Sequence, residues 1–150
     1  MQNSHLIGQN ILKINRYIKL GLRNALGAYH LGVVEGMVLF SLLQGNSEMC
    51  FKTQEQIINE LNYDKGVMSR AINTLQENGY IKQEVNEKDR RSKVLVVTHK
   101  ADGLKQILEN IFREWDKMLL DGFEEEDIRT ANCFLNKLEK NAKNLYKKSL

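Results

Sequence analysis

The chain of 150 residues contains no proline, only two cysteines and no long apolar run. The absence of proline allows helical periodicities to continue, which favours a mainly helical chain with few rigid turns. No apolar stretch approaches the roughly 20 residues that span a bilayer, and residues 1–10 lack the charged and apolar regions of a signal peptide. We therefore expect a cytoplasmic protein without a membrane partner.

The cysteines and histidines give no sign of a metal or redox centre. Cys50 and Cys133 lie far apart with no CxxC spacing, so neither a disulfide framework nor a zinc knuckle is indicated. We interpret both as small packing thiols, with oxidant sensing as the alternative. The three histidines show no HxxxH or ExxH spacing, and no nucleophile with a base emerges. We expect no metal, no cofactor and no enzymatic activity.

The net charge leaves the partner open, so the distribution of charge has to decide. Lysine and arginine number 22 against 19 acidic residues, which gives a net charge of +3. The apolar content of 42% suffices for a real core. A single chain of one domain with helical extensions is the simplest organisation.

Both ends of the chain carry long apolar stripes at helical spacing, over residues 6–27 and 101–148. Together they offer more apolar length than one small domain can cover. We predict that these helices form a homodimer interface, although they could instead pack on each other. The candidate interface residues are Ile11, Ile14, Ile18, Leu108, Ile111, Trp115, Leu135, Leu138 and Leu145.

Two capping signals predict a helix-turn-helix in the middle of the chain. Thr53 and Gln56 satisfy the S/T-x-x-E/Q capping box at the start of a short helix. After a tight turn, Asp64 is suited to cap the next helix. Residues 49–51 are three apolar residues that could pair as a short third strand.

The helix after Asp64 has an apolar face and an opposite face built from small residues and hydrogen-bond donors. Such a face could approach a DNA groove and contact bases or phosphates, while the alternative is an ordinary solvated helix face. The residues of this predicted recognition helix are Lys65, Gly66, Ser69, Arg70 and Asn73.

A basic hairpin follows this helix. Residues 80–85 and 93–97 read as strands on either side of NEKDRRS, the densest basic cluster of the chain, and Thr98 could cap the helix that follows. Helix-turn-helix and hairpin together predict a winged helix over residues 31–98, which grips duplex DNA in its common use. The alternative is a soluble hairpin tip. The wing residues are Lys88, Asp89, Arg90, Arg91 and Lys93.

The stretch SRAINTLQENGYIKQEVNEKDRRSKVLVVT, with Asp89, Arg91 and Thr98 in a D-x-R…T pattern, resembles the MarR family of bacterial transcriptional regulators. The resemblance runs over nearly the whole chain and implies a mainly α fold with a small β-hairpin. It also implies a two-fold dimer joined through terminal helices and a palindromic operator. Members of this family are usually repressors relieved by an inducer or oxidant.

The function indicated by residues and resemblance together is sequence-specific binding of double-stranded DNA by a homodimeric repressor. The alternative is a winged helix that binds a protein partner and has no DNA affinity. A small-molecule effector could bind among four aromatic side chains, although aromatics at helical spacing are more often core. These four are Tyr29, His30, Phe40 and Trp115.

Overall fold

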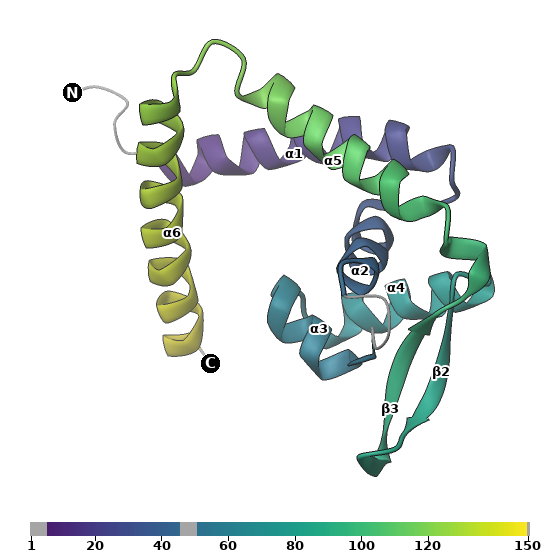
Figure 1. Cartoon of the computed structure of the whole chain (residues 1–150). Coiled ribbons are helices and arrows are strands. Elements are labelled where there is room, and N and C mark those ends of the chain that lie inside the picture. Colours follow the sequence, from purple (N-terminus) through teal and green to yellow (C-terminus); the bar gives the residue numbers. More distant parts are fainter. Residues whose placement is uncertain (1–5, 46–50, 150) are drawn as a thin grey trace. The chain divides into compact units, whose positions relative to one another are not determined.

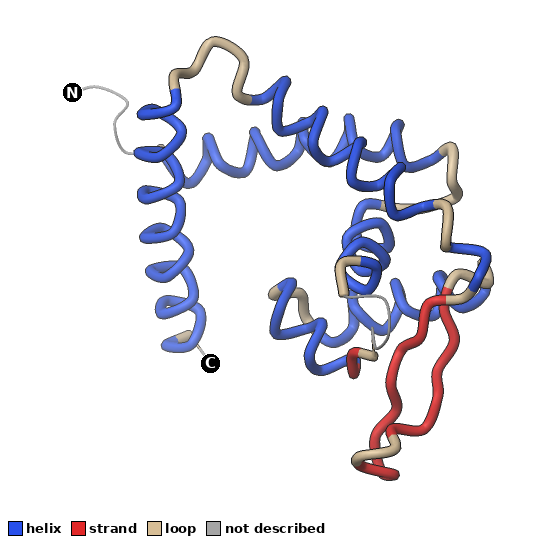
Figure 2. The backbone as a smooth tube through the Cα atoms, viewed as in Figure 1, coloured by secondary structure: helices blue, strands red, loops and turns tan. Residues whose placement is uncertain are grey.

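The computed structural model describes residues 6–45 and 51–149 and is mostly helical with one small antiparallel sheet (Figures 1 and 2). The expected fold class, a winged helix-turn-helix with helical extensions, is confirmed. The elements in chain order are α1 (Ile7–Gly27), α2 (Val33–Leu43), β1 (Lys52–Thr53), α3 (Gln54–Leu61), α4 (Lys65–Glu77), β2 (Ile81–Asn86), β3 (Asp89–Val97), a short 3₁₀ turn (His99–Ala101), α5 (Leu104–Leu119) and α6 (Glu125–Lys148).

The chain forms two compact units, residues 1–113 and residues 114–150. The first contains α1, the winged helix and most of α5, whereas the second contains the end of α5 and all of α6. Helix α1 and the start of α5 therefore belong to the same unit as the winged helix. The assignment of residues 6–27 and 101–148 to dimerisation stays a prediction.

The core of the first unit forms where α4 packs on α2. The predicted apolar face of α4 is buried, and α2 contributes residues with no exposed surface. Burying one such aliphatic side chain contributes about 1.5–3 kcal/mol relative to leaving it exposed. The outward face of α4 is thus fixed by what the inward face buries, namely Met68, Ala71, Ile72 and Leu75 against Val38, Leu39 and Leu42.

Helices α1 and α2 approach closely at Gly36. A Cβ atom on this glycine would lie 2.9 Å from Cδ1 of Leu26, whose side chain is fully buried. Real Cβ atoms essentially never approach another heavy atom this closely. The glycine therefore allows a contact between the two helices that alanine would push apart.

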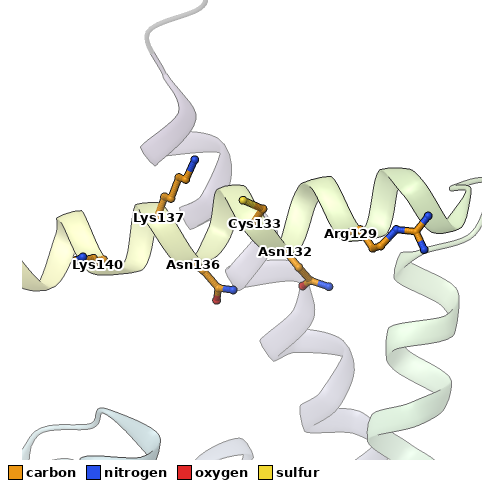
Figure 3. Close-up of a pocket in the computed structure, with 6 residues that line it drawn as sticks. All are labelled: Arg129, Asn132, Cys133, Asn136, Lys137 and Lys140. Atoms are coloured by element: carbon orange, nitrogen blue, oxygen red, sulfur yellow. The ribbon is translucent and has the colours of Figure 1, made fainter.

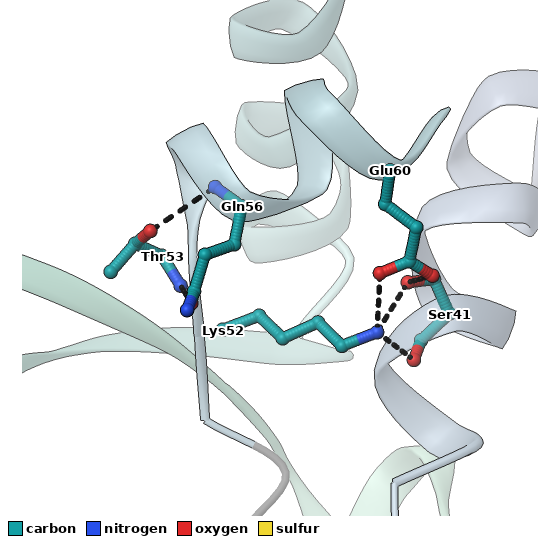
Figure 4. Close-up of polar contacts among 5 residues, drawn as sticks. All are labelled: Ser41, Lys52, Thr53, Gln56 and Glu60. Carbon is teal, nitrogen blue, oxygen red and sulfur yellow. Dashed lines mark hydrogen bonds and ion pairs between the residues drawn. The ribbon is translucent and has the colours of Figure 1, made fainter. Parts of the chain in front are cut away.

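The two predicted helix starts are confirmed. In α3 the Thr53 hydroxyl accepts a hydrogen bond from the Gln56 backbone N–H, and the Gln56 amide oxygen accepts from the Thr53 N–H at 2.8 Å (Figure 4). In α4 a carboxylate oxygen of Asp64 accepts from the Val67 N–H at 2.9 Å. These caps set where the helix-turn-helix begins and where the recognition helix begins.

The turn between α3 and α4 is tight. Asn62 adopts the left-handed conformation, with φ of 56°, and ends α3. The Tyr63 hydroxyl lies 3.6 Å from Sδ of Met37 on α2, and burial raises the pKa of Tyr63 above its ordinary value. Tyr63 therefore stays neutral and anchors the turn to α2.

The sheet has the strand order β1-β3-β2, with both pairs antiparallel. The third strand lies at Lys52–Thr53, later than the predicted residues 49–51, and pairs with Val94 and Leu95. Met49 and Cys50 lie outside the described residues. This pairing attaches the start of α3 directly to the wing.

The predicted start of the second wing strand was wrong. Strand β3 begins at Asp89 rather than Lys93, so the hairpin turn contains only Glu87 and Lys88. Pairing continues past a bulge after Val85, with Asn86 opposite Asp89. Asp89, Arg90 and Arg91 are all polar and exposed, so this part of the strand lacks the alternation of apolar and polar residues that marks a strand in a sequence.

Thr98 does not cap the following helix, contrary to the prediction. Its hydroxyl instead donates to the Gly79 carbonyl at 2.6 Å, where Gly79 has φ of 74°. Nearby, the Tyr80 hydroxyl donates to the Tyr29 carbonyl at 2.9 Å, and the Lys100 ammonium lies 4.9 Å from the centre of the Tyr80 ring. These contacts join the end of α4 to the end of the wing and to the turn after α1.

Helix α3 is also held against α2 by a lysine-centred cluster (Figure 4). The Lys52 ammonium donates to the Ser41 carbonyl at 3.0 Å and to the Ser41 hydroxyl at 2.9 Å, and it pairs with Glu60 at 2.7 Å. The Ser41 hydroxyl donates to the other Glu60 oxygen at 2.7 Å. The hydrogen bond from Lys52, followed by that from Ser41, holds the pKa of Glu60 below its ordinary value.

The second unit is dominated by α6, a helix of 24 residues. Acidic residues occupy its first turn and lysines its last, as the sequence predicts, and both placements favour the helix dipole. Glu124 and Asp127 form a capping box at its start, and none of its residues is buried. Within the described part of the chain, we find no helix that is long and apolar enough to cross a membrane.

Candidate nucleic-acid interface

The outward face of α4 presents the predicted recognition residues together. Lys65, Gly66, Arg70 and Asn73 are exposed, whereas Ser69 is half-buried. Because the opposite face is locked in the core, this face is held outward as one rigid surface. A helix of this kind can enter a major groove with its small residues closest to the bases.

The wing, formed by β2 and β3, extends beyond α3 and α4 as a two-stranded arm (Figure 1). Its tip is ordered by side-chain hydrogen bonds to the backbone: Asn86 accepts from the Lys88 N–H, and Asp89 accepts from the Arg91 N–H, both at 3.0 Å. The Ser92 hydroxyl donates to the Asp89 carbonyl at 3.0 Å. The hairpin therefore has a defined shape on which long basic side chains can be displayed.

Asp89 acts on Arg91 through the backbone. Its carboxylate bonds the Arg91 N–H, which fixes the course of the strand, and among the described residues no ion pair joins the two side chains. The Arg91 guanidinium stays exposed. An exposed guanidinium on a thin arm is suited to a narrow minor groove.

The basic side chains of this surface form no ion pair with the residues that the structure describes. In residues 6–45 and 51–149, no carboxylate lies within ion-pair distance of any of them. Six exposed cations on one helix and one hairpin make a surface that attracts a polyanion. They are Lys65, Arg70, Lys88, Arg90, Arg91 and Lys93.

The predicted dimer residues divide by exposure. Leu108 is fully buried inside the first unit and has no surface left for a partner, so its assignment to the interface is corrected to the core. Ile18, Ile111, Trp115 and Leu138 are half-buried. The remaining candidates are exposed on their helices: Ile11, Ile14, Leu135 and Leu145.

Two of the four aromatic residues proposed for an effector site make contacts within the first unit, Phe40 through its ring and Tyr29 through its backbone. The Phe40 ring lies 5.1 Å from that of Phe112, and the Tyr29 backbone carbonyl accepts the Tyr80 hydroxyl. His30 is exposed with φ of 56° at the turn after α1. Trp115 belongs to the other compact unit. The effector site stays a prediction.

Cys133 is exposed within the chain, contrary to the expectation that it packs as a small apolar residue. It lies on α6 in a shallow hollow lined by residues of that helix alone, with Arg129 and Lys137 one turn away on either side (Figure 3). Cys50 lies outside the described residues. No group of three His, Cys, Asp or Glu side chains suited to a metal is found in the described ranges.

Comparison with known proteins relates this geometry to a family. A model described as "MarR family" matches residues 31–92, which cover α2, α3, α4 and most of the wing. The chain is 28% identical to the HTH-type transcriptional regulator BilQ of Clostridium symbiosum, over 73% of this chain and 74% of that protein. It also superposes on a MarR transcriptional regulator from Methanosarcina mazei Go1 with a TM-score of 0.78 and 27% identity, over 95% and 99% of the two chains.

The chain is thus similar to the MarR family, in sequence over its winged helix and in fold over nearly its whole length. A MarR-family regulator from Listeria monocytogenes, solved with a 26mer DNA, shares its fold with a TM-score of 0.79 and 24% identity over 94% of this chain and 89% of that one. The relatives and solved structures to which the chain is similar are transcriptional regulators, which agrees with the expectation that the chain is not an enzyme.

Sequence patterns missed one residue that contacts this surface. Gln54, the first residue of α3, donates a hydrogen bond to the Ser69 hydroxyl at 2.8 Å. Its position beside the Thr53 cap is visible in the sequence, but the contact joins residues 15 apart and depends on the packing of α3 against α4.

Proposed function

We propose that this protein is a DNA-binding transcriptional regulator of the MarR family that acts in the cytoplasm as a homodimeric repressor of palindromic operators. The observation that carries the proposal is the set of six exposed cations on α4 and the wing, none of which forms an ion pair with another described residue. The DNA-bound Listeria relative of the same fold supports it. Relief by a small molecule or stress signal is proposed from the resemblance to the family.

Each part of the surface has a distinct task in this proposal. The outward face of α4 enters the major groove, where Ser69, Arg70 and Asn73 face base edges and Lys65 faces phosphate. Gly66 allows the backbone to come close. Arg91 enters the adjacent minor groove, with the other wing cations on phosphates.

A second copy of the chain is proposed to cover the apolar terminal helices. Helix α6 has 24 residues and none of them is buried, whereas most helical stability in proteins comes from the packing of an apolar face. Both α1 and α6 carry exposed large apolar side chains, which in a monomer would form unusually large apolar surfaces. Two-fold pairing would set two recognition helices about 34 Å apart, one DNA turn.

The test is duplex binding measured by fluorescence anisotropy across a salt series. Operators are first selected from genomic fragments with the purified protein. We expect binding that weakens steeply with salt, since each phosphate contact releases counterion. If the protein shows no salt-sensitive affinity for duplex DNA but binds an acidic protein partner, the proposal is refuted. That result would favour the alternative of a winged helix that binds a protein.

Arg91→Ala should weaken operator binding about tenfold and lower the salt slope by about one, as expected for loss of one groove arginine. The matched control is Arg113→Ala, an exposed arginine on α5 that pairs with Glu109. Sedimentation should show the same assembly for both variants. Equal operator affinities for the two variants would remove Arg91 from the interface.

Leu135→Glu should convert the dimer to monomer and abolish tight operator binding, because it places a charge in the proposed apolar dimer interface. Asn136→Glu, on the neighbouring position of α6, adds the same charge outside that set. A Leu135→Glu protein that sediments as the parent does would exclude α6 from the interface.

A further inference from the structure

Gln54 connects the first turn of α3 to the outward face of α4, which is proposed to contact DNA. Its amide nitrogen lies 2.8 Å from the Ser69 hydroxyl oxygen, and both side chains are half-buried. The backbone of Gln54 is fixed because Thr53 both caps α3 and pairs with Val94 of the wing. The fixed backbone of Gln54 therefore positions its side-chain amide next to Ser69.

The hydrogen bond from Gln54 determines whether the Ser69 hydroxyl can donate or accept a further hydrogen bond. A serine hydroxyl has one hydrogen to donate and two lone pairs to accept with. The Gln54 N–H occupies a lone pair, and in the described part of the chain no acceptor takes the Ser69 hydroxyl hydrogen. The Ser69 hydrogen is thus not taken by any described residue and can be donated to DNA.

Gln54 also faces the wing. A groove of about 520 Å³ between the start of α3 and the hairpin is lined by Gln54 together with Asn86, Ser92 and Lys93. The amide thus lies between the two parts of the proposed DNA surface. It is placed to hold the recognition helix while itself remaining next to the groove that DNA would cover.

We propose that Gln54 is a specificity-determining positioning residue, which fixes Ser69 as a hydrogen-bond donor toward DNA. This inference rests on the proposed function. The operator base pair that faces Ser69 then presents an acceptor, such as guanine N7 or O6 or thymine O4, at the edge Ser69 reaches. A cytosine amino group at that edge is disfavoured, because it would meet another donor.

The test uses the selected operator and a panel of duplexes with every single base-pair substitution. Gln54→Met keeps the length of the side chain and removes the amide without adding charge. We expect it to reduce discrimination at one operator position about tenfold, on the scale of one lost base contact, and to leave the salt slope unchanged. Ser69→Ala should reduce discrimination between base pairs at the same operator position. Ser69→Thr, which keeps the hydroxyl, should preserve that discrimination.

The double variant separates a paired role from two independent ones. If Gln54 acts through Ser69, adding Ser69→Ala to Gln54→Met should change discrimination less than twofold further. Additive losses, or a Gln54→Met effect equal on all duplexes, would overturn the inference. Should Gln54→Met not fold, a Ser69→Ala protein with an unaltered base profile overturns it instead. Salt-sensitive binding by the parent protein tests the proposed function separately.

Discussion

Replacing Lys52 by methionine should lower the free energy of unfolding by about 2 kcal/mol. The change removes charged hydrogen bonds and the cation that interacts with the C-terminal end of α2. The ammonium satisfies the Ser41 carbonyl in the last turn of α2 and holds Glu60 of α3. Methionine keeps most of the apolar stem. The change therefore removes the charge and the hydrogen bonds with little loss of packing.

The magnitude follows from the exposure of each contact. The ion pair to Glu60 is screened, because the two side chains are 27% and 45% exposed, so it contributes about 0.2–1 kcal/mol. Ser41 is only 4% exposed, and leaving its carbonyl without the ammonium costs about 1–3 kcal/mol. The Ser41 hydroxyl keeps its bond to Glu60 and adds little to the loss.

Urea unfolding at one fixed protein concentration measures the effect, because the stability of an oligomer depends on concentration. The matched control is Lys82→Met, which removes an exposed lysine paired with Glu84 on the wing and should cost less than about 0.5 kcal/mol. If the two variants unfold at the same midpoint, the Lys52 cluster does not stabilise the packing of α3 on α2.

The pH dependence of the same variant gives a second test. The folded-state pKa of Glu60 is lowered from its ordinary 4.5, so its contribution is present above that value and is lost as the pH falls through the lower folded pKa. The stability gap between the parent and Lys52→Met should stay constant from about pH 7 to 5 and narrow below 4.5. A gap that widens with acid would contradict the assignment.

Two further substitutions test the packing of the first unit. Gly36→Ala should destabilise by about 1–3 kcal/mol in thermal unfolding, because its Cβ would collide with buried Leu26, whereas Gly8→Ala, with open space around it, should not destabilise. Thr98→Val should cost about 1 kcal/mol, because the Gly79 carbonyl loses its hydroxyl donor; an unchanged melting temperature for this variant would show that the contact contributes nothing.

Local interactions made the helix-turn-helix predictable. Thr53 and Gln56 are three residues apart and cap one turn, and Asp64 bonds an N–H three residues ahead. Neither contact depends on the rest of the chain, so residue type and spacing suffice to predict it. The same holds for the buried face of α4, because helical periodicity assigns residues to faces without tertiary knowledge.

Contacts between segments that are distant in the sequence could not be predicted from residue type and spacing. Thr98 has the right residue type for a cap, but its hydroxyl reaches the Gly79 carbonyl, 19 residues away. Leu108 belongs to a regular stripe, and periodicity cannot say which part of a stripe faces its own chain. Gln54 was missed for the same reason, since its partner Ser69 lies on another helix.

Tyr80 joins the turn after α1 to the place where α4 meets the wing, since its hydroxyl and its ring are both engaged. The stability of the fold and the placement of the wing consequently depend on one residue. A variant damaged at Tyr80 would be degraded faster as well as bind less well, because a loss of 1–2 kcal/mol can change cellular abundance about several-fold. A change in promoter activity in such a strain would therefore report protein quantity as much as DNA affinity, and protein levels should be measured beside promoter activity.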